Sequence, residues 1–240
     1  MSAPITLYQF ELCPFCHKVK AALELEGIPF VKVEVNPMTK KELPELEGNE
    51  KRKVPVIDVD GRLIADSSAI LAFLENEYQA PYSLSSRGDE PNDTSKSQQV
   101  EAWVDEDLAQ VLPAVIYGKW RDALRAAKVV AKSSNFGVVQ NAVVRGGGSL
   151  IMHQVAKKIV ARRGGENPQQ MLDDEMDKFE QWLGDDDFIG GSELCIGDAA
   201  AHGCLTCIQD FPAFEEIMRR PKVQAWYQRV QALRSQRRAA

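Results

Sequence analysis

The sequence has 240 residues, of which 44% are hydrophobic and 27% charged, and this composition excludes a disordered, collagen-like or low-complexity chain. Its 29 Lys and Arg residues are outnumbered by 35 Asp and Glu, and the net charge of -6 argues against nucleic acid as the main partner. No run of about 18 apolar residues is present, so the sequence predicts no transmembrane segment.

Cysteine usage and the N-terminal residues bear on the compartment. Five cysteines are too few for a disulfide scaffold, and their odd number leaves at least one thiol unpaired, which favours a reducing environment. The first residues lack the basic and apolar regions of a signal peptide and the Arg- and Ser-rich pattern of a transit peptide. We therefore expect a cytoplasmic protein.

The chain begins with a predicted strand-helix-strand unit. Residues 5–10 form an apolar, β-rich run, and residues 30–35 alternate like a half-buried strand. Between them, residues 14–26 have helical periodicity, with Pro14 at the first helical position and Gly27 at the end. This order predicts a right-handed parallel βαβ unit.

The next segment completes a small α/β domain. A charged stretch at 39–50 is interpreted as a helix, and residues 54–65 contain two short β-rich runs around an Asp-Gly turn, which predicts an antiparallel hairpin. A further helix follows and ends near Tyr78. The predicted order for residues 1–78 is βαβ-α-ββα.

Beyond this domain the composition changes. Residues 79–94 are rich in Pro, Ser, Asn, Asp and Gly, as in an inter-domain linker, and residues 95–240 show helical periodicity without a strand pattern. We expect helices at 119–132, 149–162 and 168–183, among others. The fold class predicted is α/β followed by an all-helical domain.

The motif that carries chemistry is Cys13-Pro14-Phe15-Cys16, at the junction of the first strand and first helix. There the Cys13 sulfur faces the unpaired N–H groups of the helix N-terminus, which lowers the pKa of a thiol and favours the nucleophilic thiolate. Cys16 lies one turn further on and suits a resolving role. The alternative is a pair of small buried residues, but the strand-to-helix context favours redox chemistry.

Two other uses of these cysteines are less consistent with the sequence. Cys-Pro-Phe-Cys-His, ending at His17, fits the c-type haem attachment pattern, but no export signal accompanies it. A four-thiolate zinc site with Cys204 and Cys207 is also conceivable. That second pair lies in an apolar helical stripe, so we interpret it as core packing and predict no metal site.

Two further positions suit a peptide-like ligand. If the Val54-Pro55 bond is cis, the Val54 amide and carbonyl turn outward and can pair with a peptide backbone, although base rates favour an ordinary trans bond. Asp66 and Ser67 precede a helix, where backbone N–H groups attract a carboxylate and the Asp can bind an ammonium group. Taken alone, that pair is more often a simple N-cap.

A thiolate, an outward strand edge and a site for an amino-acid head together match the shape of glutathione. The arrangement resembles the glutathione transferase superfamily. Within it, LYQF-x-x-CPFC, VEVNP, KVP and DSS are similar to the soluble part of the type-two (membrane-associated) prostaglandin E synthase family. The similarity is dense before residue 80 and sparse after it, where it includes the pattern from Gly190 to Asp198.

The resemblance implies a thioredoxin-like domain followed by a glutathione-transferase-type helical domain. It implies that Cys13 is the thiol partner of glutathione and that Phe15 packs beside Cys13. Val54 before a cis-Pro55 would pair with the tripeptide backbone, and Asp66 with Ser67 would hold its γ-glutamyl end. It also implies non-covalent haem as a second ligand at Cys13 and a homodimer.

The sequence departs from the family pattern at three places. Phe10 replaces a Tyr that donates a hydrogen bond to the first cysteine in many of these synthases. A hydrophobic N-terminal anchor is not seen, so membrane association is not implied. In the helical domain, Cys195 stands where the capping motif has Ser or Thr three residues before Asp198, and it is a weaker cap.

The leading hypothesis is a glutathione-dependent transferase or isomerase that uses Cys13 against an apolar electrophile or peroxide. A glutaredoxin-like thiol-disulfide oxidoreductase is an alternative, with Cys16 resolving the mixed disulfide. A non-catalytic scaffold or haem-binding module is another. Tyr117 is a candidate for the apolar substrate pocket, although aromatic residues at helical spacing are usually part of the core.

Overall fold

The computed structural model describes residues 4–49, 51–84, 95–118, 160–161 and 167–239. The N-terminal part contains β1 (Ile5–Gln9), α1 (Pro14–Leu25), β2 (Phe30–Glu34), β3 (Val56–Val59), β4 (Arg62–Ala65) and α2 (Ser67–Glu77). These six elements match the strands, the hairpin and the two main helices that the sequence predicts.

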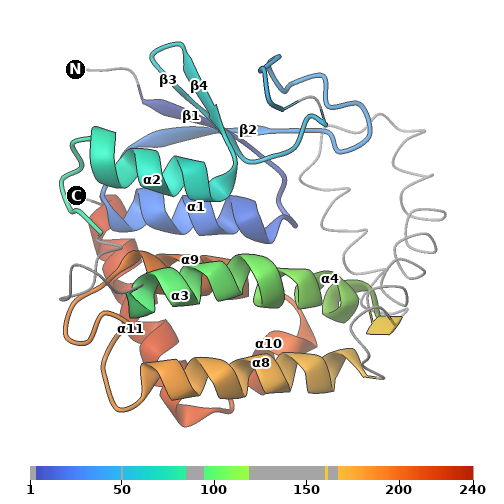
Figure 1. The fold of residues 1–240 in the computed structure, drawn as a ribbon, viewed down its shortest axis with the longest axis vertical. Coiled ribbons are helices and arrows are strands. Elements are labelled where there is room, and N and C mark those ends of the chain that lie inside the picture. The colour runs from blue at the N-terminus through green and yellow to red at the C-terminus, as the bar shows by residue number, and fades with distance from the viewer. Residues whose placement is uncertain (1–3, 50, 85–94, 119–159, 162–166, 240) are drawn as a thin grey trace.

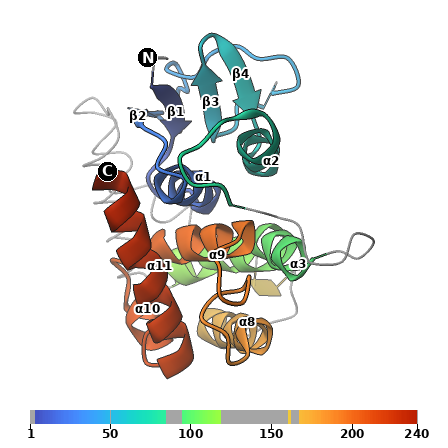
Figure 2. The same cartoon turned by 90° about the vertical axis from the view of Figure 1, so that its left-hand side faces the viewer.

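The four strands form one mixed sheet in the order β2-β1-β3-β4. β1 pairs in parallel with β2, and antiparallel β3 and β4 continue the sheet. Helices α1 and α2 cover one face of this sheet (Figures 1 and 2). At the hairpin turn, Asp60 and Gly61 have φ of 52° and 89°, the positive values that a two-residue turn of this hand requires.

The predicted helix at 39–50 is wrong: its described residues, 39–49, form turns and loop. Pro44 cannot donate the backbone hydrogen bond of a helix interior, and Lys40 has a left-handed φ of 52°. The side-chain oxygen of Asn36 also accepts hydrogen bonds from the amides of Met38 and Thr39, at 2.9 and 3.2 Å, which stabilises a turn instead. The observed order is therefore βαβ-ββα.

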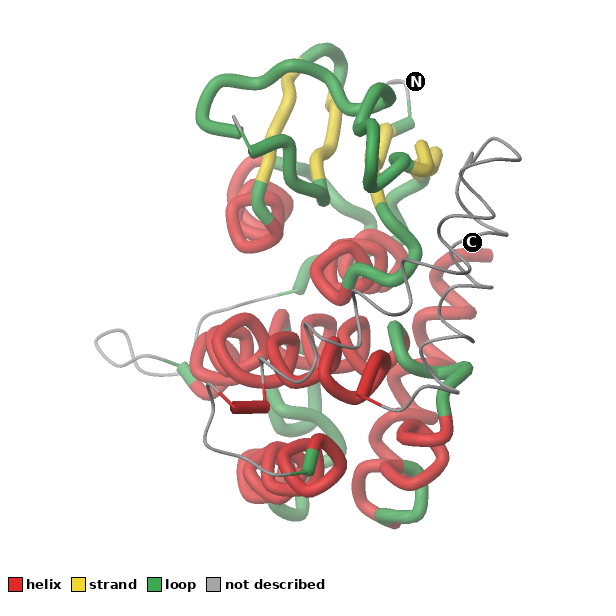
Figure 3. The backbone as a smooth tube through the Cα atoms, turned by 90° about the vertical axis from the view of Figure 1, so that its right-hand side faces the viewer, coloured by secondary structure: helices red, strands yellow, loops and turns green. Residues whose placement is uncertain are grey.

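The described residues after α2 are predominantly helical. They form α3 (Lys96–Trp103), the π-helix η1 (Val104–Leu108), α4 (Ala109–Gly118), α8 (Pro168–Leu183), α9 (Ile196–Thr206), α10 (Pro212–Ile217) and α11 (Pro221–Ala239). The expected helix at 119–132 and nearly all of that at 149–162 lie outside the described residues. Figure 3 shows the strands at one end of the molecule and the helices stacked beyond them.

The predicted helix at 168–183 is confirmed by α8. The Asn167 side chain accepts a hydrogen bond from the Gln169 amide at 3.0 Å, and Pro168 occupies the first turn. Gly184 ends the helix with a φ of 60°. Local signals at both ends are enough to specify this helix.

Helix α9 begins with a cap built around Asp198. Its carboxylate accepts hydrogen bonds from the amides of Ile189 and Cys195, at 2.9 and 3.0 Å, and from Trp226 Nε1 at 2.7 Å. The Cys195 Sγ donates to the same carboxylate at 3.2 Å. Asp198 therefore anchors the helix start to two other segments, the loop at Ile189 and α11, which offsets the weak cap at Cys195.

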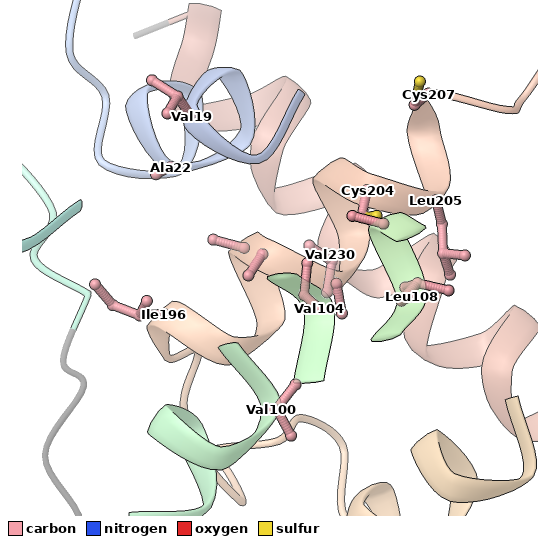
Figure 4. Close-up of a cluster of buried hydrophobic side chains, with 14 of the residues drawn as sticks. Val19, Ala22, Val100, Val104, Leu108, Ile196, Cys204, Leu205, Cys207 and Val230 are labelled. Carbon is pink, nitrogen blue, oxygen red and sulfur yellow. The ribbon is translucent and has the colours of Figure 1, made fainter. Parts of the chain in front are cut away.

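The two halves of the molecule meet where α1 crosses α9. A Cβ at Gly203 would lie 2.4 Å from the carbonyl oxygen of His17, so only glycine allows this approach. Apolar side chains of α1, α3, η1 and α9 continue through the contact into one core (Figure 4). None of the described helices combines the length and the apolar character needed to span a bilayer.

Candidate functional site

Cys13 occupies the N-cap position of α1, directly before Pro14. Its φ and ψ of -100° and 113° are extended, and its amide donates a hydrogen bond to the Phe10 carbonyl at 3.0 Å. The chain thus turns sharply out of β1 and directs Cys13 toward the start of the helix. The side chain is half-buried, whereas Cys16 is fully buried.

The two thiols have opposite pKa shifts. The Cys16 side chain lowers the pKa of Cys13 by hydrogen bonding, and the backbone amides of Cys16 and Phe15 and the charge of Lys20 act in the same direction against burial. Burial raises the pKa of Cys16, and its interaction with Cys13 raises it further. Cys13 is therefore the member of the pair that ionises first, as the helix N-terminus predicts.

The Val54-Pro55 peptide bond is cis, as the family resemblance implies. Pro55 is buried, while Val54 is half-exposed and precedes Val56, the first paired residue of β3. Its backbone therefore lies at the end of the ladder rather than within it.

Asp66 is the N-cap of α2, with a positive φ of 79°. One of its carboxylate oxygens, Oδ1, accepts hydrogen bonds from the amides of Ser68 and Ala69, at 3.1 and 3.2 Å. Ser67 is buried at the first position of the helix. The N-cap interpretation of this pair is confirmed, and the exposed position of Asp66 leaves its second oxygen, Oδ2, accessible for a ligand.

The sheet register brings these three motifs to one edge. Tyr8 pairs with Val56, and Val56 pairs with Ala65, so these residues form one row across β1, β3 and β4. Cys13 follows the first strand of this row, Pro55 precedes the second, and Asp66 follows the third. Because antiparallel strands place the end of one beside the start of the next, the motifs share one edge of the sheet.

Lys18 is a residue near this site that the sequence analysis missed. Its side chain is 0% exposed, and its ammonium group donates to Ser68 Oγ at 3.1 Å and to the carboxylates of Glu101 and Asp105, both at 2.8 Å. Ser68 Oγ in turn donates to Asp105 at 2.8 Å. This network joins α1 and the start of α2 to α3 and η1, and no local pattern signals it because its partners lie far away in sequence.

Tyr117, the candidate for the apolar pocket, packs against the main core at the end of α4. Burial raises its pKa above the ordinary value, and the negative charge of an ionised Cys207 would add to the rise. Burial likewise raises the pKa of Cys207, with a smaller contribution from Cys13. Tyr117 and Cys207 therefore both stay protonated at neutral pH.

Cys204 on α9 and Cys207, the C-cap of that helix, are buried among apolar side chains, as the core interpretation predicts (Figure 4). Across the described part of the chain, no cluster of three or more His, Cys, Asp and Glu side chains has a geometry suited to a metal ion.

Comparison with protein families gives two matches. The family described as glutathione S-transferase, N-terminal domain, matches residues 7–82. The family described as glutathione S-transferase, C-terminal domain, matches residues 166–233. The first match covers the α/β domain, and the second falls within the helical domain that follows it.

Individual proteins agree with this assignment. The chain is 25% identical to prostaglandin E synthase 2 of Mus musculus over 272 aligned positions, covering 96% of this chain and 70% of the mouse protein. Its fold is similar to that of apo glutathione S-transferase III, with a TM-score of 0.65, 18% identity and coverage of 99% and 97%. A glutathione S-transferase of Methylobacterium radiotolerans, in complex with glutathione sulfonate, has a TM-score of 0.60, 21% identity and coverage of 96% and 91%.

Proposed function

Because the chain belongs to the glutathione S-transferase superfamily, we propose that it is a glutathione-dependent transferase or isomerase with Cys13 as its nucleophile. The single observation that carries the proposal is the position of Cys13 at the N-cap of α1, beside Cys16 and the backbone amides of the first turn, which lower the pKa of its thiol. A thiolate is the reactive form of cysteine, and a position at a helix N-terminus stabilises it.

Glutathione is the ligand that the shared edge of the sheet suits best. Val54 offers backbone at the end of the ladder, and Asp66 with Ser67 offers a carboxylate and a helix N-terminus for the γ-glutamyl head. Phe15, half-buried in the first turn of α1, would pack beside the ligand thiol. The glutathione sulfonate bound by the Methylobacterium protein supports this ligand class.

The relation to prostaglandin E synthase 2 favours an apolar peroxidic or electrophilic substrate. For isomerisation of a cyclic peroxide, the thiolate sulfur bonds to one peroxide oxygen as the O–O bond breaks, and the other oxygen leaves as an alkoxide that takes up a proton. Loss of the proton from the carbon that bears the sulfur-bound oxygen then forms a carbonyl and expels the thiolate. The sulfur thus ends the cycle unchanged.

A thiol-disulfide oxidoreductase is the second candidate, and the adjacent Cys16 favours it. Here the Cys13 thiolate attacks a mixed disulfide of glutathione and displaces the other thiolate. A second glutathione, or Cys16, then attacks the Cys13–glutathione disulfide, and glutathione disulfide or free glutathione leaves.

The Cys16→Ser variant distinguishes the two reactions. If Cys16 resolves the mixed disulfide, turnover of a glutathione mixed disulfide should fall at least about tenfold in the variant. Isomerisation of a peroxide substrate should change little, because only the Cys13 sulfur is used. Equal loss in both assays would contradict a separate resolving role.

A pH titration of Cys13 alkylation tests the proposal as a whole. The alkylation rate should have its midpoint below about pH 7, whereas a midpoint near 8.5 would identify a scaffold without an activated thiol. Calorimetric titration with glutathione supplies the matching binding measurement.

Haem and the homodimer stay predictions from the resemblance. A thiolate can ligate haem iron, so Cys13 would hold the haem, and none of the reaction steps above uses it.

A further inference from the structure

Lys20 is a buried cation on the same face of α1 as the two thiols. Its side chain is only 6% exposed. It follows Cys16 by four residues and Cys13 by seven, the spacings at which side chains lie one above another along a helix. Burial of an ammonium group costs free energy, so lysines are seldom buried unless they are paired with an anion.

The ammonium group of Lys20 reaches back toward the N-terminus of α1. Side chains of a helix point in this direction, and the contacts of Lys20 agree. Its Nζ lies 3.3 Å from His17 Nε2 and 3.5 Å from a carboxylate oxygen of Glu11. Because Glu11 precedes Cys13 by two residues, the positive charge lies near the first turn of the helix, where the thiols are.

Residues of the sheet hold Glu11 in place. The Gln9 side chain donates to the carboxylates of Glu11 and Glu34, at 2.9 and 2.6 Å, and the Glu11 amide donates to Glu34 at 3.0 Å. Gln9 ends β1 and Glu34 ends β2, so Glu11 is fixed to the ends of two neighbouring strands. Its ion pair with Lys20 therefore keeps the ammonium group at the start of α1.

The charge of Lys20 acts on both thiols. Hydrogen bonding from the Cys16 side chain is the largest cause of the lowered pKa of Cys13, and the charge of Lys20 acts in the same direction. Burial is the largest cause of the raised pKa of Cys16, and Lys20 opposes it. Phe10, three positions before Cys13, has no side-chain donor for the sulfur. Lys20 supplies stabilisation that needs no hydrogen bond to the sulfur.

The surroundings of Lys20 preserve this charge. Burial lowers the pKa of Lys20, and the ion pair with Glu11 opposes the shift and favours the charged form. Among the described residues, the titratable groups that act on Lys20 come from the loop before α1, from α1, from β2 and from α9, and they are Glu11, Cys16, His17, Lys32, Glu34 and Cys207. His17 is uncharged at neutral pH because burial lowers its pKa to about 3.

We propose that Lys20 is a positioning residue of the thiol site: its buried ammonium group, held by Glu11, stabilises negative charge on the sulfurs of Cys13 and Cys16. The inference rests on the proposed function and deepens it, because both candidate reactions place negative charge on sulfur. In isomerisation, Cys13 begins and ends the cycle as a thiolate. In disulfide exchange, Cys16 becomes a thiolate when it attacks the mixed disulfide.

The equilibrium of the Cys13–Cys16 disulfide with a cysteine–cystine buffer at pH 7 tests this role. In the exchange, two cysteines pass two electrons to the protein disulfide and leave joined as cystine. Because the reduced protein carries the Cys13 thiolate, Lys20→Met should shift the equilibrium toward the protein disulfide by about fivefold. Lys20→Arg keeps the charge and should stay within about twofold of the unaltered protein.

The rate of Cys13 alkylation by iodoacetamide at pH 7 is the second measurement. It should fall by about fivefold in Lys20→Met, because less of the sulfur is thiolate. Lys178→Met, which removes an ion pair with Glu175 on α8, is the control and should change neither the rate nor the equilibrium. Circular dichroism checks folding, and Lys20→Gln, which leaves a polar group beside Glu11, is measured in parallel with Lys20→Met.

Two results would overturn the inference. One is an unchanged equilibrium and alkylation rate in the folded Lys20→Met and Lys20→Gln variants. The other is an equal change in Lys20→Arg, which would show that the shape of the side chain matters rather than its charge. None of these comparisons uses glutathione. A failure of glutathione to bind the unaltered protein would therefore contradict the proposed function alone.

Discussion

Glu26 is a buried carboxyl group at the C-terminal end of α1. One oxygen accepts a hydrogen bond from the Leu84 amide at 3.2 Å, and the other is buried without a hydrogen-bond partner among the described residues. Burial raises its pKa to about 7, which the Leu84 amide opposes. The hydrogen bond from Leu84 to Glu26 therefore joins the chain after α2 to α1, while burial makes the ionised form of the Glu26 carboxyl group unfavourable.

This pKa predicts a pH dependence of stability. Between the ordinary glutamate pKa and about 7, the folded state holds a proton that the unfolded state has lost. The contribution of Glu26 to the free energy of unfolding therefore falls as the pH rises through this window, by about 3 kcal/mol in total, and is constant above it. Glu26→Gln should remove this loss.

Urea unfolding at pH 5 and pH 8 measures the effect. The fall in the free energy of unfolding from pH 5 to pH 8 should be smaller in Glu26→Gln than in the unaltered protein. Glu47→Gln, at an exposed loop position, is the control and should behave like the unaltered protein. Identical pH dependence in all three would show that Glu26 does not carry the shift.

The start of α9 combines its own cap with a distant anchor. Cys195 has the extended φ and ψ of an N-cap, -128° and 176°, and it forms a capping box with Asp198, although sulfur is a weaker hydrogen-bond acceptor than the hydroxyl of Ser or Thr. The bonds from Ile189 and Trp226 to Asp198 hold the helix start from outside. The element is stable through its tertiary contacts, which local capping rules do not include.

Because Ser is among the best N-cap residues, Cys195→Ser should stabilise the protein by about 0.5–1 kcal/mol. The Ser hydroxyl fits the N-cap backbone geometry that Cys195 already has. Thermal unfolding of Cys195→Ser and Cys195→Ala measures the gain. If the two variants have the same stability, the cap at this position is irrelevant and Asp198 alone holds the helix.

At the scale of the whole molecule, the α/β half and the helical half share a buried charge network. Lys18 extends from α1 to Glu101 and Asp105, and Ser68 completes the network from α2. Asp105 lies in η1, where the π-helical turn interrupts the helix between α3 and α4. The two halves are therefore joined by buried charges as well as by the apolar contact of α1 with α9.

Lys18→Met should destabilise the folded state by about 3 kcal/mol, because it leaves two carboxylates without their buried partner. Lys96→Met is the matched control: its ion pair with Asp186 is exposed, and its loss should cost less than about 1 kcal/mol. Chemical denaturation of both variants provides the comparison. Equal effects would contradict a special role for the Lys18 network.

The sequence by itself determined the elements whose signals are local. Pro14 and Gly27 bound α1, Asn167 and Gly184 bound α8, and the Asp-Gly pair specifies the hairpin turn. The position of Cys13 before α1 follows from the same local order. Each of these features depends on the conformational preferences of residues within one or two turns, so no knowledge of the rest of the molecule is needed.

Only the tertiary structure decided the features that depend on distant partners. Residues 39–49 have the charged composition of a helix but form turns that Asn36 stabilises, and Lys18 is buried because carboxylates from α3 and η1 reach it. Helix α11 packs against α1, so residues more than 200 positions apart in the sequence, such as Leu25 and Arg237, come into contact. Burial and charge pairing are properties of the assembled chain, and sequence periodicity does not specify which distant side chains will meet.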